Sequence, residues 1–230
     1  DTDNQTLVIG NKKNIFIFRF VTGIGGFGLF TGLQTISENV SGDIGYVVQV
    51  EGDQILASGG TPRLGGRYNS FVSYYEYNGV LWDDIPAQTF SSPVTGNLFD
   101  EFGFSMSMGK NEVIIGSPNE YRRRLNTVGH GEAYHYVYTR ARNRPGREWR
   151  PAMGLGSFYN IDCPGGNFGT SVNFYGNNLI VSAPYENYHF PPDLILENKP
   201  NTGRVYLFRK NRGGTFSQAA VIAPDFDRAI

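Results

Sequence analysis

The sequence predicts an all-β protein built from a four-stranded antiparallel unit that occurs several times along the chain. The first observation is compositional: 30 glycines and 12 prolines are spread along 230 residues that also hold 17 phenylalanines and 14 tyrosines, a mixture typical of short strands joined by tight turns. The second is a set of landmarks that recurs three times in one register. With 40% hydrophobic residues, the chain is expected to fold and not to remain disordered.

The landmarks predict the first two strands of each unit. Each landmark consists of a glycine and a small residue thirteen positions later: Gly45 with Ser58, Gly103 with Gly116, and Gly169 with Ser182. Between the members of each pair lies a short turn, at residues 51–54, 109–112 or 175–178, and an apolar run follows the turn. Each pair therefore predicts a hairpin of two short strands.

The third and fourth strands follow each hairpin. The third strands are predicted at residues 71–77, 132–138 and 204–208, with apolar or aromatic residues on both faces, as expected of a sheet covered on both sides. The fourth strands are predicted to begin after Gly79, Gly146 and Gly213, each of which stands three residues ahead of a large aromatic residue. Residues 7–10 and 15–18 repeat the second and third strands, which predicts a partial unit. The predicted segments are 1–38 (partial), 39–96, 97–162, 163–224 and the start of another unit at 225–230.

Two units carry the residues of a known repeat. Phe102 and Gly103 with Gly116 and Pro118, and Phe168 and Gly169 with Ala183 and Pro184, resemble the FG-GAP repeat of integrin alpha-subunit propellers. The resemblance implies a β-propeller of four-stranded antiparallel blades, with about four blades here as part of a larger, typically seven-bladed, propeller. At Ile44 and Gly45, and again at residues 58–60, the Phe and the Pro of the repeat are missing.

The motif residues have a physical reason to recur. A glycine beside the innermost strand lets neighbouring backbones approach closely, and a proline ends a strand where no further amide donor is needed. Because one blade cannot bury both of its faces, the blades are expected to stack on one another. Two alternatives stay open: a β-sandwich with coincidental turns, and a closed four-bladed ring whose ends share one blade, since Phe226 matches Phe102.

Charge and cysteine content argue against several classes of protein. The formal net charge of −1 gives no overall attraction to nucleic acid or to an anionic membrane. We find no apolar run of eighteen residues and no signal-peptide pattern, so we expect no membrane insertion in this stretch. Cys163 is the only cysteine, which leaves no intrachain disulfide or cysteine-based zinc site. Because the chain begins at Asp1 and not at Met, we expect a mature or excised piece.

We expect neither a cofactor nor catalysis in these units. Integrin-type blades often carry a calcium loop between their first two strands, but here those turns supply too few carboxylates for the six to eight oxygens that calcium needs. Calcium is expected only in blades outside this stretch, and Asp1 to Asp3 are interpreted as a frayed terminus. Nucleophile-elbow, zinc-protease and phosphate-loop motifs are missing, and residues 23–28 are interpreted as a glycine-rich β-turn.

The remaining chemically reactive residues are interpreted as structural. His130, His135 and His189 lie on separate strands or loops, and His135, within a predicted strand, is expected to be a structural histidine rather than a ligand. Cys163 is expected to be a small semi-buried residue or an exposed free thiol.

The loops between second and third strands are the candidate ligand-binding elements. They span residues 61–69, 118–131 and 184–202, and the last two are longer than a hairpin requires. Arg and Tyr side chains commonly anchor interfaces, and these loops are expected to emerge on the face that resembles the ligand-binding side of integrin-type propellers. The candidates are Arg63, Arg67, Tyr68, Tyr121, Arg122, Arg123, Arg124, Tyr185, Tyr188 and His189.

A second basic cluster surrounds the turn between the third and fourth strands of the 97–162 unit. Its members are Arg140, Arg142, Arg144, Arg147 and Arg150. We interpret it as a solvated turn, with binding of sulfated glycan or another anion as the alternative. Asn4 and Asn39 satisfy the N-glycosylation rule and fall outside the predicted strands.

The resemblance implies an extracellular or cell-surface recognition or adhesion module, and together with the loop composition it predicts a chain that is not an enzyme and that binds a protein or glycan through loops on one propeller face. Two alternatives remain. The chain is a structural subunit of an extracellular filament or surface assembly, with self-assembly through its ends, or it is a non-catalytic propeller attached to an enzyme.

Overall fold

The computed structural model describes residues 2–3, 6–22, 28–37, 43–63, 67–93, 101–119, 131–140, 146–155, 166–186 and 202–223. Within these segments the chain forms sixteen β-strands and no helix, which confirms the all-β prediction. Accordingly, the described segments contain no helix long and apolar enough to cross a membrane.

The strands form four sheets of four, each in chain order and antiparallel throughout. The first sheet holds β1 (Thr2–Asp3), β2 (Thr6–Gly10), β3 (Asn14–Thr22) and β4 (Gly28–Ser37). The second holds β5 (Asp43–Glu51), β6 (Gln54–Arg63), β7 (Arg67–Glu76) and β8 (Gln88–Phe90). The third holds β9 (Ser105–Gly109), β10 (Glu112–Ser117), β11 (Glu132–Arg140) and β12 (Arg147–Leu155). The fourth holds β13 (Val172–Tyr175), β14 (Asn178–Ala183), β15 (Arg204–Lys210) and β16 (Phe216–Ile222).

Two expectations about the first two units are wrong. The first unit is not partial, because Thr2 and Asp3 pair with Leu7 and Thr6 as a short first strand and are not a frayed terminus. Residues 61–63 and 67–69 belong to strands and not to a loop, because β6 and β7 continue as a ladder that still pairs Arg63 with Arg67. Ladder hydrogen bonds satisfy the backbone polar groups in both places.

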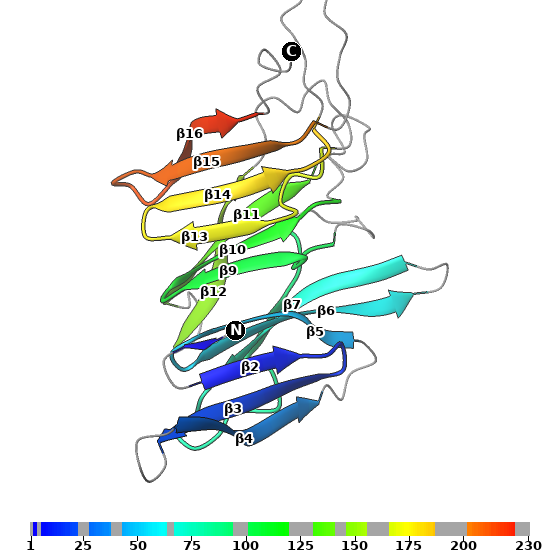
Figure 1. Cartoon of the computed structure of the whole chain (residues 1–230), viewed down its shortest axis with the longest axis vertical. Coiled ribbons are helices and arrows are strands. Elements are labelled where there is room, and N and C mark those ends of the chain that lie inside the picture. The colour runs from blue at the N-terminus through cyan, green and yellow to red at the C-terminus, as the bar shows by residue number, and fades with distance from the viewer. Residues whose placement is uncertain are drawn as a thin grey trace, which may run out of the picture.

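The sheets stack in chain order, and the first and fourth lie at opposite ends of the molecule (Figure 1). The described sheets therefore form an open stack of blade-like units, and the alternative of a closed four-bladed ring is not what the structure shows.

Each interface between neighbouring sheets has its own apolar cluster. In the second and third sheets, side chains along the second strand alternate between the two clusters that flank the sheet. In β6, Ile55 and Ala57 face the first sheet and Leu56 faces the third. Ile114 of β10 faces the fourth sheet and packs there near Phe168. Each sheet between two neighbours is thus buried on both faces, as nearest-neighbour stacking requires.

The motif glycines make these close contacts feasible. Gly45, Gly103 and Gly169 have φ of 85°, 88° and 94°, a backbone region that residues other than glycine rarely adopt. A Cβ on Gly103 would lie 2.7 Å from the Cβ of Ser58 in the preceding sheet, and one on Gly169 would lie 2.4 Å from a backbone oxygen of the third sheet. Each glycine is therefore needed both for the turn and for the approach of two sheets.

The two Phe-Gly units have equivalent surroundings. Phe102 and Phe168 are 1% and 0% exposed, and both rings contact the third strand of their own sheet. The contacts are Phe102 with Tyr134 and Tyr136, at ring-centroid distances of 5.9 and 6.0 Å, and Phe168 with Tyr206 and Phe208, at 5.3 and 6.1 Å. Of the closing residues, Gly116, Pro118 and Ala183 are buried and Pro184 is half-buried.

A glutamine joins each of the first two sheets to the next. Gln34 of β4 donates to the backbone oxygen of Trp82 (2.6 Å) and accepts from its backbone nitrogen (2.9 Å). Gln88 of β8 does the same for Trp149, with both bonds at 2.8 Å. The position in register with these glutamines is Met153 in the third sheet, so the sequence has no glutamine at that position of the third sheet.

Candidate functional site

A cleft opens between the second and third sheets, beside two motif glycines. Its volume is about 420 Å³, and its lining is mainly apolar, which is within the usual range of ligand sites. Gly59 and Gly60 of β6 and the turn at residues 101–104 line it. Gly60 lies in the second half of β6 and Ser70 near the start of β7, so the cleft lies toward the edge of the stack where second strands connect to third strands.

Two aromatic side chains flank the cleft. Tyr46 and Phe104 directly follow the motif glycines Gly45 and Gly103, and their side chains are 43% and 51% exposed. The left-handed turn at each glycine sends the buried motif residue inward and leaves the next residue facing solvent. The two rings come from adjacent sheets, so only the stacking of those sheets brings them to one cleft.

Two neighbouring charged residues hold Tyr46, and Glu101 in the cleft lining supplies a carboxylate. The Tyr46 hydroxyl donates to Asp43 Oδ2 at 2.8 Å, and Lys12 Nζ lies 5.3 Å from the centre of the Tyr46 ring. Partial loss of hydration raises the pKa of Glu101 at the cleft, while a hydrogen bond with Asn119 acts in the opposite direction. The cleft therefore combines aromatic rings with a carboxylate.

The predicted ligand-face residues are only partly described. Arg63, Arg67 and Tyr68 belong to the β6–β7 ladder, and Tyr185 follows β14 with its side chain 55% exposed. The other candidates lie outside the described residues: Tyr121, Arg122, Arg123, Arg124, Tyr188 and His189.

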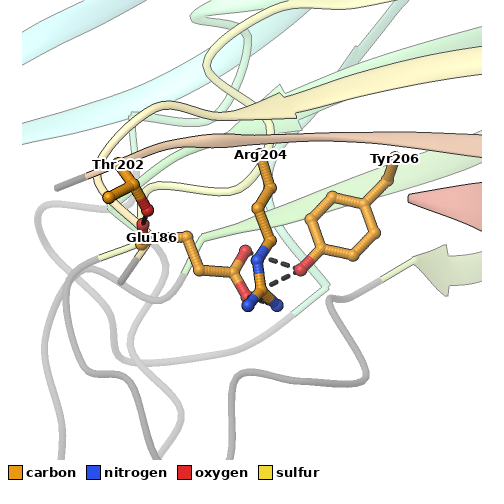
Figure 2. Close-up of polar contacts among 4 residues, drawn as sticks. All are labelled: Glu186, Thr202, Arg204 and Tyr206. Atoms are coloured by element: carbon orange, nitrogen blue, oxygen red, sulfur yellow. Dashed lines mark hydrogen bonds and ion pairs between the residues drawn. The ribbon is translucent and has the colours of Figure 1, made fainter. Parts of the chain in front are cut away.

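A buried polar cluster fixes the two ends of the connection that follows β14 (Figure 2). The Glu186 side chain is fully buried; the Tyr206 hydroxyl lies 2.6 Å from both of its carboxylate oxygens, and Arg204 Nη1 lies 3.4 Å away. The Glu186 backbone oxygen accepts hydrogen bonds from Thr202 Oγ1 (3.2 Å) and from the Gly203 amide (3.0 Å). The chain thus leaves and re-enters the fourth sheet at one fixed point, next to Tyr185.

The basic cluster near the turn after β11 is engaged with its own sheet. Arg147 Nη2 donates to the backbone oxygen of Tyr138 at 2.8 Å and to Asn111 Oδ1 at 3.0 Å. Arg150 forms an ion pair with Glu148, and Arg140 is exposed. Arg142 and Arg144 lie outside the described residues.

His135 is a buried structural residue between the third and fourth sheets. It is 1% exposed, and its Nε2 lies 3.3 Å from Glu112 Oε2, a carboxylate that also pairs with Lys210 of β15. Burial lowers the pKa of His135; the Lys210 charge acts in the same direction and Glu112 opposes it. Cys163, His130 and the glycosylation candidates Asn4 and Asn39 lie outside the described residues. In the described segments, no three His, Cys, Asp or Glu side chains are grouped so as to hold a metal ion.

Sequence reasoning missed the cleft residues Tyr46, Phe104 and Glu101 and the buried Glu186. A signal for the first two was available, because an aromatic residue directly follows the motif glycine in two of the three units. For Glu186 we find no such signal, since its burial depends on the return of the chain at residue 202.

The sequence matches no protein-family model, and no curated protein matches it. The residues and their geometry therefore carry the functional argument.

Proposed function

We propose that the chain is an extracellular recognition module of the integrin alpha-like FG-GAP type, and that it binds a partner protein through the cleft between its second and third sheets. The observation that carries the proposal is that two exposed aromatic residues, Tyr46 and Phe104, line one mainly apolar cleft. Exposed aromatic side chains beside a preformed cleft are typical anchors of protein interfaces. The proposal gives this chain no catalytic role of its own.

A protein side chain suits the cleft better than a sugar does. Sugar sites need several polar groups to pair the ligand hydroxyls, because each unpaired buried polar group costs free energy. Here the lining is mainly apolar, and its polar side-chain groups belong to Ser58, Ser70, Glu101 and the Tyr46 hydroxyl, of which the last already donates to Asp43. A side chain with an apolar stem and a basic end would stack on the rings and reach the Glu101 carboxylate.

The test is selection from a phage-displayed peptide library, with a glycan array probed in parallel. We expect peptides with a basic or aromatic anchor residue, and we expect Tyr46→Ser and Phe104→Ser each to weaken their binding by about 10-fold or more, as for interface anchors. Tyr175→Ser is the matched control, because Tyr175 is 86% exposed and lies at the opposite edge of the stack, at the end of β13 next to the turn into β14.

Three results would count against the proposal. The first is that no peptide binds the wild-type chain. The second is that Tyr175→Ser weakens binding as much as Phe104→Ser does. The third is that only glycans bind. The chain would then be a lectin, and the apolar lining would not have favoured a protein ligand over a sugar.

A further inference from the structure

The two end sheets of the stack each present an apolar face to solvent. In β3 of the first sheet, Ile15 and Ile17 are buried against the second sheet. Since side chains alternate along a strand, Phe16, Phe18 and Phe20 point the other way. The Phe20 ring contacts Phe30 of β4 at 5.3 Å, so Phe30 lies on the same outward side.

This outward surface matches, position by position, a surface that is buried elsewhere in the chain. Leu7 pairs with Phe18 as Val113 pairs with Tyr136, and Phe20 pairs with Phe30 as Tyr138 pairs with Trp149. We call Leu7, Ile9, Phe16, Phe18, Phe20 and Phe30 the first-sheet face. Its counterparts in register are Val113, Ile115, Tyr134, Tyr136, Tyr138 and Trp149, all in the cluster between the second and third sheets.

The first-sheet face and its counterparts differ in how much of each side chain is exposed. Phe20 and Phe30 are 37% and 40% exposed, whereas their counterparts Tyr138 and Trp149 are 8% and 1% exposed. The spacing of the two ring pairs is nearly the same, because the ring centroids of Tyr138 and Trp149 lie 5.2 Å apart and those of Phe20 and Phe30 lie 5.3 Å apart. The first-sheet face is therefore already arranged to receive a neighbouring sheet.

The fourth sheet carries the opposite half of the same interface. Ile180 pairs with Leu207 as Leu56 pairs with Tyr74, and Leu56 and Tyr74 are buried against the third sheet. We call Ile180, Val205 and Leu207 the fourth-sheet face. Its counterparts in register are Val8, Ile15 and Ile17 in the first sheet, Leu56, Val72 and Tyr74 in the second, and Ile114, Ala133 and His135 in the third. All nine counterparts are at most 2% exposed, whereas Ile180 is 46% exposed.

We propose that the fourth-sheet face of one copy of this chain packs on the first-sheet face of a second copy, head to tail. The contact repeats the interface that the chain makes three times within itself, so its shape is set by contacts that are already present. Clustered apolar side chains at the surface of a folded protein mark an interaction site. Because the two faces differ, the contact is heterologous and not a two-fold one.

A charged residue supports this direction of packing. At the edge of the interface between the first and second sheets, the Arg19 guanidinium lies 5.6 Å from the ring centre of Tyr77. Arg209 is in register with Arg19, and Phe20 is in register with Tyr77. In the head-to-tail contact, Arg209 of one copy would lie over Phe20 of the next, where a cation and a ring attract. The proposal does not depend on the cleft, which lies at a different interface.

The test measures mass against concentration by sedimentation for three variants. Phe30→Asp blocks the first-sheet face, Ile180→Asp blocks the fourth-sheet face, and Ile85→Asp is the control because Ile85 is 80% exposed and lies outside both faces. We expect the wild type and the control to associate as concentration rises. We expect each face variant alone to associate at least about 30-fold more weakly, as for loss of an interface anchor.

Mixing the two face variants tests the direction of the contact. Phe30→Asp keeps an intact fourth-sheet face and Ile180→Asp keeps an intact first-sheet face, so an equimolar mixture should form a dimer with one copy of each. A monomeric wild type at every concentration would overturn the proposal. Loss of association in Phe30→Asp but not in Ile180→Asp would also overturn it, because first-sheet faces would then pack on each other. Should either variant unfold by circular dichroism, Phe20→Ser and Leu207→Ser block the same faces.

Discussion

Replacing Gly169 by alanine tests whether the motif glycine is required by the approach of two sheets. Its φ of 94° would cost an L-residue about 1–2 kcal/mol. In addition, the new Cβ would lie 2.4 Å from the backbone oxygen of Glu132 and 3.2 Å from the Ser117 nitrogen. Because that oxygen belongs to the backbone of the third sheet, relief requires the sheets to move apart, and overpacking of this kind costs about 1–3 kcal/mol.

Gly176→Ala is the matched control. Gly176 also has a positive φ, of 60°, but a Cβ there would meet no atom within 4 Å. Both variants gain a similar stabilisation through the unfolded chain, so the difference between them isolates the steric contact. We expect Gly169→Ala to lower the free energy of unfolding by about 1–3 kcal/mol more than Gly176→Ala does.

The assay is urea unfolding followed by circular dichroism and by tryptophan fluorescence. Trp149 is buried in the third sheet and reports on the sheet that the new methyl group would displace. Equal unfolding free energies for the two variants would refute the reasoning, because the glycine would then be required only for its backbone conformation.

Three further predictions concern buried polar contacts. Gln88→Leu should lower the free energy of unfolding by about 2–4 kcal/mol, because it leaves two backbone groups of Trp149 unpaired; a loss below about 1 kcal/mol in urea unfolding would contradict this. Tyr206→Phe should cost about 1.5–3 kcal/mol, since it removes a hydrogen bond to the buried Glu186 carboxylate; an unchanged thermal midpoint would argue against that role. Burial lowers the pKa of His135 below its ordinary 6.5, so the unfolded chain takes up this proton first and stability falls as pH drops below about 6.5; His135→Gln should lose less stability between pH 7 and 5, and equal losses in urea titrations would exclude the effect.

Most strands and their order could be predicted from local patterns; the exceptions include β8, which lies at Gln88–Phe90 and not at Trp82. The glycine at the start of each unit and the small residue thirteen positions later fix a hairpin length, and the structure has β9–β10 and β13–β14 at those places. The strand and loop predictions were wrong where the local sequence pattern was weak. Arg63 and Arg67 look like loop residues, yet the ladder continues to them because each added pair satisfies backbone groups.

The candidate site could not be predicted in the same way. Tyr46 and Phe104 are 58 residues apart in the chain, and no local pattern states that their rings flank one cleft. Glu186 has the sequence context of a surface loop residue, and only the return of the chain at Thr202 buries its carboxylate beside Tyr206.

The sequence by itself determined that a four-stranded unit recurs along the chain, because turn glycines and alternating apolar residues act within one unit and over short distances. Only the tertiary structure decided how those sheets meet. Stacking brings Gln88 to Trp149, opens the cleft beside Phe104, and leaves Phe30 and Ile180 exposed at the two ends. The physical reason is that burial depends on which sheet lies next to which, and that information is shared between residues far apart in the chain.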